Sequence, residues 1–301
     1  MALEVDILGM LDRKQKYLQI AFNRTLEEIA VMINSLPLSD RIILEAGYPL
    51  IKTYGTRAIS TIKTLWEQRV LGYGLGAVET PEIKSFQLYK AGHGSPLLDL
   101  LLKSIEKRKI EKPKREFLDY NPPKAGSRSP IGGWTPKKEI AFTPYIIADL
   151  KCMDRAFTEV EAAASAGASA ATCLGLAPVE TIDAFIKRCE EIGIDSMLDM
   201  MNIEYPFEVL SKLIKPPTII MLHRGVDEGE ENREKEIPYQ KIERIKNVYD
   251  DVLIAVAGGE TIREVITGAF NDADIIVVWR LFNENPEKIV AITNEFLKEI
   301  K

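Results

Sequence analysis

Eight short apolar runs recur along the chain, and segments with helical periodicity separate most of them. Each run is five or six residues long and rich in small or β-branched side chains. This pattern is typical of parallel strands that are buried on both faces. We therefore expect strands at 18–23, 41–45, 145–149, 169–173, 195–200, 218–223, 252–257 and 274–278.

The segments between the runs carry helix signals. Thr25 and Glu28 form a capping-box pattern, and Gly193 ends the segment 178–193 as a C-cap glycine. Eight strand–helix units in succession predict a (β/α)8 TIM barrel. A doubly wound open sheet is the alternative, because periodicity alone does not show that a sheet closes.

One interval breaks this repeat, since the second and third runs start 104 residues apart and most others 22 to 34. Removing 72–140 restores the spacing. We therefore expect 72–140 to be an insertion between the second helix and the third strand, with one helix near 97–105. The segment 1–17 is then an N-terminal extension, and 18–71 with 141–301 forms the barrel. A helix-to-strand connection lies at the barrel's N-terminal end, which favours a role in packing or oligomerisation.

Composition and charge narrow the functional class. With 46% apolar and 28% charged residues, the chain suits a globular protein with a large core. No apolar run approaches the roughly 18 residues of a membrane span, and the N-terminus lacks the basic segment of a secretory signal. We therefore expect a cytoplasmic protein that does not contact a membrane. Its three cysteines, Cys152, Cys173 and Cys189, lack the spacing of a disulfide framework or a zinc site and are expected to be reduced.

The net charge of −6 is unevenly distributed. Residues 101–140 hold eleven basic and five acidic side chains, a local charge of +6. This basic segment is the one feature that favours nucleic acid as a partner. Binding to the acidic surface of a protein partner would explain its charge equally well. Nucleic acid is therefore not the expected partner, although an inactive barrel that binds RNA or protein through its insertion stays an alternative.

Polar and ionisable residues gather where the expected strands end. Catalytic side chains of a TIM barrel lie at these carboxyl ends. The strand ends hold Asn23, Glu45, Asp149 with Lys151, Cys173, Asp199, His223, Gly258 with Gly259, and Arg280. Eight arbitrary strand ends would not usually collect so many ionisable groups, so we expect the site here.

Two carboxylates, Glu45 and Asp149, end neighbouring strands. They repel each other, and a hard divalent cation such as Mg²⁺ relieves that repulsion. Lys151 shares a face with Asp149, and we expect it to stay protonated and to stabilise a developing oxyanion. His223, at the mouth of the barrel, suits acid–base chemistry near neutral pH.

The sequence after the seventh strand suits a phosphate group. Gly258 and Gly259 precede a helix, and backbone amides at such a turn bind anions. The loops after strands seven and eight are also the usual phosphate site of this fold. Arg280 adds a permanently charged, fork-shaped donor there.

The chain also resembles a known group of enzymes. Asp149, Lys151 and Asp154 match the D-x-K-x-x-D signature of the orotidine 5′-monophosphate decarboxylase suprafamily. The stretch ILEAGYPLIK places Glu45 where the orotidylate enzymes carry lysine, which is more similar to 3-hexulose-6-phosphate synthases and 3-keto-L-gulonate-6-phosphate decarboxylases. Three further stretches match the family: MLDMMNIE, LHRGVDE and VAGGETI. The HxGxD form around His223 is more similar to the synthases than to the decarboxylases. The resemblance covers about 18–71 and 141–300.

The resemblance implies a Mg²⁺-dependent carbon–carbon lyase that acts on a ketose phosphate through a metal-bound enediolate. Reversible condensation of formaldehyde with ribulose 5-phosphate is the reaction it favours. It implies Glu45 and Asp149 as metal ligands and Lys151 as the group that stabilises the enediolate. His223 would move protons, and Asp199 would belong to the same catalytic set.

The resemblance further implies a substrate phosphate held by Gly258, Gly259 and Arg280. It implies that Asn23 binds substrate, and that the protein is a homodimer in which Asp154 enters the partner's site.

The chain departs from the pattern at three places. Asn23 stands where the first strand usually ends in Asp, Trp279 replaces a small glycine beside the phosphate, and 72–140 is absent from the simple enzymes. A decarboxylase or aldolase that acts on another sugar phosphate is therefore the alternative enzymatic interpretation.

Overall fold

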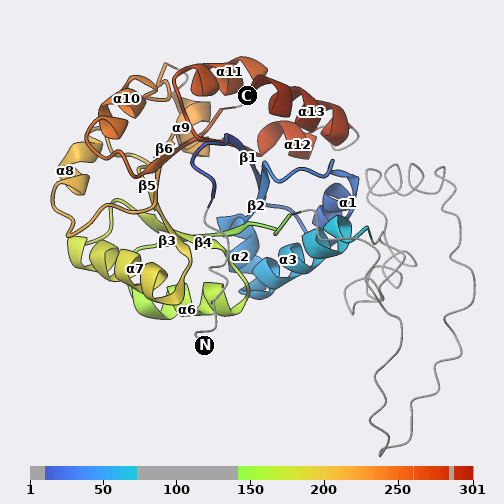
Figure 1. Ribbon diagram of the computed structural model, residues 1–301, viewed down its shortest axis with the longest axis horizontal. Helices are drawn as coiled ribbons and strands as arrows, with labels where there is room; N and C mark the ends of the chain where they lie inside the picture. Colours follow the sequence, from blue (N-terminus) through green and yellow to red (C-terminus); the bar gives the residue numbers. More distant parts are fainter. Residues whose placement is uncertain (1–10, 73–141, 233, 260, 285–287, 301) are drawn as a thin grey trace, which may run out of the picture.

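Eight parallel strands close into a barrel in chain order, and helices surround it (Figure 1). The computed structural model describes residues 11–72 and 142–300, apart from 233, 260 and 285–287. The strands are β1 (Tyr17–Phe22), β2 (Ile42–Ala46), β3 (Ile146–Cys152), β4 (Ala170–Leu174), β5 (Asp195–Asp199), β6 (Ile219–His223), β7 (Leu253–Ala257) and β8 (Ile275–Val278). All eight predicted strands are confirmed, and closure between β1 and β8 excludes the open sheet.

The helices follow the strands as expected for a TIM barrel. They are α1 (Leu26–Ser35), α2 (Tyr48–Tyr54), α3 (Arg57–Val70), α6 (Ala156–Ser165), α7 (Val179–Ile192), α8 (Pro206–Leu210), α9 (Val226–Glu231), α10 (Gln240–Lys246), α11 (Ile262–Phe270), α12 (Arg280–Glu284) and α13 (Ile289–Glu299). The capping box of Thr25 and Glu28 is present, and Gly193 ends α7 in the left-handed conformation. The short helix α2 is an addition that the apolar pattern did not predict.

Alternation along each strand divides the core into two layers. On β1, Leu18, Ile20 and Phe22 pack outward against the helices, while Tyr17 and Ala21 point into the barrel. Gln19 lies between them on the inward face and is completely buried. A polar side chain therefore interrupts the apolar filling of the barrel directly below its mouth.

The expected insertion, apart from Gly72, and residues 1–10 of the expected extension lie outside the described residues. The domain boundaries thus stay predictions. Within the described part, Leu11 packs against the inner core. All three cysteines are buried free thiols. Among the described helices, none is long and apolar enough to cross a membrane.

Candidate active site

An irregularity in β3 shapes the centre of the mouth. Ala148 pairs with Ala171 and Cys152 pairs with Cys173, so three residues of β3 lie opposite the single residue Thr172 of β4. Lys151 takes a left-handed backbone conformation within this bulge, with φ of 46°. Bulges of this kind redirect side chains next to active sites.

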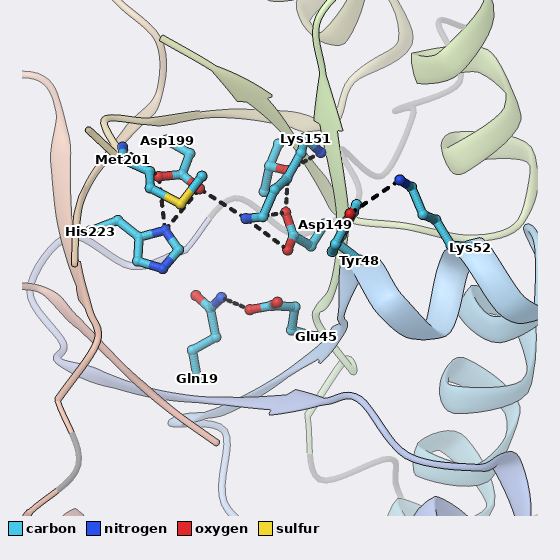
Figure 2. Close-up of polar contacts among 10 residues, drawn as sticks. Gln19, Glu45, Tyr48, Lys52, Asp149, Lys151, Asp199, Met201 and His223 are labelled. Carbon is cyan, nitrogen blue, oxygen red and sulfur yellow. Dashed lines mark hydrogen bonds and ion pairs between the residues drawn. The ribbon is translucent and has the colours of Figure 1, made fainter. Parts of the chain in front are cut away.

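Lys151 lies between two carboxylates (Figure 2). Its Nζ is 3.1 Å from Asp149 Oδ2 and 3.0 Å from Asp199 Oδ2. Burial alone would lower the pKa of Lys151, but Asp149, Asp199 and Glu45 outweigh burial and raise that pKa above its ordinary value. The ammonium group therefore stays charged at the mouth, as the sequence predicted.

His223 contacts the far side of the same carboxylate. Its Nδ1 lies 2.9 Å from Asp199 Oδ2 and 3.0 Å from Oδ1, and the backbone N–H of Met201 donates to Oδ1 at 2.9 Å. Burial would raise the pKa of Asp199, but His223 and Lys151 lower it. Asp199 is thus an anchored anion that orients both Lys151 and His223, and Nε2 is the ring nitrogen left for proton transfer.

Glu45 is buried on the adjacent wall of the barrel, where it accepts a hydrogen bond from Nε2 of Gln19. Burial and the charge of Asp149 raise the pKa of Glu45 to about 7. The other polar atom of the amide, Gln19 Oε1, is buried and has no hydrogen-bond partner in the described part of the chain. The sequence reasoning missed Gln19, although a polar residue at an inward position of an apolar strand was a usable signal.

These oxygens fit a hard divalent cation. The charge of Asp149 together with burial raises the pKa of Glu45, and Gln19 Oε1 is a buried acceptor without a partner in the described chain. Among the described residues, no group of three or more His, Cys, Asp and Glu side chains is arranged to hold a metal. Mg²⁺ is commonly bound through only one or two carboxylates, with water and substrate completing its shell, and a pair of carboxylates is compatible with that mode of binding.

The expected phosphate turn follows β7. Gly258 has a φ of 95°, and a Cβ there would collide with the carbonyl oxygen of Arg224. Nη2 of Arg224 donates to Gly258 O at 2.7 Å and to Glu264 Oε1 at 3.2 Å. Arg224, which the sequence reasoning did not single out, therefore fixes the turn that carries Gly259.

Arg280 begins α12. Its Nη2 donates to Glu230 Oε1 at 2.8 Å, and its guanidinium lies 5.4 Å from the ring centroid of Trp279. A phosphate that binds Arg280 would compete with the Glu230 carboxylate for the same donor.

The remaining predicted residues lie outside the cluster of Glu45, Asp149, Lys151, Asp199 and His223. Asn23 packs against Gly47, where a Cβ would collide with its side chain. Asp154 is exposed, and its Oδ1 accepts a hydrogen bond from the backbone N–H of Arg155 at 2.7 Å.

Cys173 does not face the mouth, although it lies at a strand end. It belongs to the outer layer of the core, because inward positions of β4 fall on Ala170 and Thr172. Its Sγ donates to Cys152 O at 3.2 Å, and its interaction with the Cys152 side chain, together with burial, raises the pKa of the thiol.

Comparison with known proteins gives matches over most of the chain. The family model "Orotidine 5′-phosphate decarboxylase / HUMPS family" matches residues 141–291. The bifunctional enzyme Fae/Hps of Methanocella arvoryzae is 28% identical over 288 residues, which cover 95% of this chain and 53% of that protein. The Fae/Hps enzyme of Archaeoglobus fulgidus is 39% identical over 170 residues, which cover 54% of this chain and 41% of that protein. The chain therefore spans about half the length of these curated relatives.

Solved structures share the fold. The 3-hexulose-6-phosphate synthase from Salmonella typhimurium matches with a TM-score of 0.61 at 18% identity, covering 94% of this chain and 98% of that one. KGPDC from Streptococcus mutans matches with a TM-score of 0.55 at 14% identity, covering 95% of this chain and 97% of that one.

Proposed function

The chain belongs to the orotidine 5′-phosphate decarboxylase / HUMPS family, and we propose that it is a carbon–carbon lyase of the 3-hexulose-6-phosphate synthase type. The substrates of this proposal are ribulose 5-phosphate and formaldehyde, in a reversible condensation. Two facts support this choice within the family. The curated relatives are named Fae/Hps, and Glu45 occupies the strand end where the resemblance places lysine in orotidylate enzymes.

The observation that carries the proposal is the pairing of Lys151 and His223 through Asp199. One carboxylate orients a permanent cation at 3.0 Å and an imidazole at 2.9 Å. A cation stabilises an oxyanion as it forms, and an imidazole exchanges protons near neutral pH. A ketose needs both groups to form an enediolate: a base that removes the proton and a cation that stabilises the oxyanion.

The reaction is balanced without an oxidant. Nε2 of His223 removes a proton from C1 of ribulose 5-phosphate, and the electron pair moves toward the C2 oxygen, which Lys151 stabilises. The C2 carbonyl then re-forms as C1 attacks the carbon of formaldehyde, so the new C–C bond forms while the π bond of the aldehyde breaks. The aldehyde oxygen takes the proton from Nε2 of His223 and becomes the terminal hydroxyl of the hexulose phosphate.

Other residues of the chain bind and orient the substrate. Glu45 and Asp149 would hold Mg²⁺, which supplies positive charge to the substrate oxygens when it is bound. The amides of Gly258 and Gly259 and the guanidinium of Arg280 bind the phosphate. Asn23 donates to a substrate hydroxyl, which an amide does well although it cannot act as a base.

The proposal includes a homodimer. Asp154 is exposed at the edge of the mouth and outside the Lys151 cluster. A partner subunit placed against this edge would receive Asp154 in its own site, as the family resemblance implies.

The test is an assay of purified protein with ribulose 5-phosphate and ¹³C-formaldehyde, first with Mg²⁺ and then with excess EDTA. We expect a ¹³C-labelled hexulose phosphate in the first reaction and none in the second. A parallel incubation with 3-keto-L-gulonate 6-phosphate examines the alternative lyase, because release of CO₂ there without condensation would replace the synthase assignment.

A further inference from the structure

The hydroxyl of Thr172 joins the two functional residues of the β3 bulge. Thr172 faces the barrel interior from β4 and is 1% exposed. Its Oγ1 accepts a hydrogen bond from the backbone N–H of Lys151 at 3.0 Å. The same oxygen donates its proton to Asp149 Oδ1 at 2.7 Å.

The first contact compensates for the irregular pairing. Regular pairing between β3 and β4 stops at Ala148 and resumes at Cys152, and the Thr172 side chain provides the acceptor for the Lys151 N–H. A lysine backbone with φ of 46° is unfavourable and persists only where its surroundings hold it. The hydroxyl therefore helps to hold the turn that aims the ammonium group toward Asp199.

The second contact has a fixed direction. A hydroxyl has one proton, and because the Lys151 N–H points at Oγ1, that proton is directed to Asp149. Oδ1 of Asp149 thus accepts the proton of Thr172, and the Nζ of Lys151 lies 3.3 Å from Oδ1 and 3.1 Å from Oδ2. The shortest contact of the carboxylate is therefore with Thr172, a side chain that lies outside the cluster of ionisable residues.

We infer that Thr172 is a positioning residue, whose hydroxyl fixes both the carboxylate plane of Asp149 and the left-handed turn at Lys151. The consequence for Mg²⁺ binding and catalysis rests on the proposed function, whereas the consequence for the turn does not. Partners that orient a metal-ligating carboxylate affect metal affinity by about 10- to 100-fold when they are removed.

Three variants isolate the hydroxyl. Thr172→Val keeps the shape and removes the hydroxyl, while Thr172→Ser keeps the hydroxyl and removes the methyl group. Thr293→Val is the matched control, because Thr293 is also completely buried and its hydroxyl donates to Ile289 O within its own helix, α13. If Thr172→Val does not fold, Thr172→Ala replaces it, since Ser and Ala differ by the hydroxyl alone.

The direct readout is hydrogen exchange of the Lys151 amide, measured by NMR on uniformly ¹⁵N-labelled protein. Loss of its acceptor should speed this exchange by about tenfold in Thr172→Val, while Thr172→Ser and Thr293→Val resemble the wild type. Calorimetry with Mg²⁺ alone should show an affinity loss of about 10- to 100-fold in Thr172→Val and recovery in Thr172→Ser. In the active enzyme, Thr172→Val should lower kcat more than it changes KM. The substrate phosphate, which contributes much of the binding, is held at a different part of the site.

Two results overturn the inference. The first is unchanged hydrogen exchange of the Lys151 amide in the variant that lacks the hydroxyl. The second is a Thr172→Ser variant whose amide exchange and Mg²⁺ affinity are as impaired as those of the Val or Ala variant, because Thr172 would then act through packing. Unaltered Mg²⁺ affinity in Thr172→Val overturns the part that concerns Asp149. A wild-type protein without synthase activity refutes the proposed function instead, and the exchange measurement still decides the role of Thr172.

Discussion

Replacing Glu45 by Gln should stabilise the metal-free protein at alkaline pH. Burial and Asp149 raise the pKa of Glu45 from 4.5 to about 7 in the folded chain, so ionising this carboxyl opposes folding. The difference of about 2.5 pKa units corresponds to about 3 kcal/mol. Gln keeps an oxygen that accepts the hydrogen bond from Gln19, and it removes only the charge.

The pH dependence has a definite sign. Below pH 4.5 the carboxyl is protonated in both the folded and the unfolded chain, so it does not change the free energy of unfolding. As the pH rises from 4.5 to about 7, the unfolded chain ionises first and the wild type loses stability relative to Glu45→Gln. Above about pH 7 the deficit of the wild type levels off at about 3 kcal/mol.

The assay is urea unfolding in EDTA at several pH values between 4 and 8.5. Glu295→Gln serves as the control, because Glu295 is exposed on α13 and should give no comparable change. Adding Mg²⁺ at pH 8 should stabilise the wild type more than Glu45→Gln, since a bound cation offsets the carboxylate charges. A variant that is no more stable than the wild type at pH 8, or a stability difference that does not vary with pH, would refute the reasoning.

Three other outcomes follow from the site. Asp149→Ala and Glu45→Ala should abolish Mg²⁺-dependent turnover while circular dichroism stays native; full turnover in excess EDTA would contradict metal dependence. Arg280→Ala should raise KM for the phosphorylated ketose, and Glu230→Gln should not; equal use of the unphosphorylated sugar would refute the phosphate contact. Lys151→Ala and Asp154→Ala, each inactive alone, should recover about a quarter of wild-type activity when co-expressed, because half of randomly paired dimers are heterodimers with one intact site. Verified heterodimers without recovery would place Asp154 in its own subunit's site.

The number of strands and their alternation with helices could be predicted, because strands buried on both faces are largely apolar in sequence. Runs such as 252–257 and 275–278 are apolar throughout, and one helix separates them. Closure could not be predicted, since it depends on pairing between β1 and β8, which are far apart in the chain. The fold of 72–140 was equally beyond prediction, as its composition specifies only one helix and a basic charge.

The cluster at the mouth could be predicted in part. Glu45, Asp149, Lys151, Asp199 and His223 end strands, and the carboxyl ends of parallel strands meet at one rim. The structure adds how they are connected, above all that a single carboxylate, that of Asp199, contacts both the lysine and the histidine. That arrangement depends on side-chain directions in three strands, which no spacing along the chain reveals.

The supporting residues were missed for a different reason. Gln19 and Thr172 are single polar residues in buried strands, and such residues usually satisfy only local hydrogen bonds. Their importance comes from the bulge at Lys151 and from the uncompensated charge of Glu45. Both features arise from pairing between neighbouring strands and become visible only once the register is known.

Deuterium exchange at C1 of ribulose 5-phosphate tests the central claim most directly, because it requires an enediolate and no aldehyde. The protein would be incubated with this substrate in D₂O with Mg²⁺, and incorporation would be followed by NMR. We expect stereospecific incorporation of one deuterium by the wild type and none by Lys151→Ala, which lacks the cation that stabilises the enediolate. Absence of exchange in a folded wild-type protein, or exchange that persists in Lys151→Ala, would contradict the account.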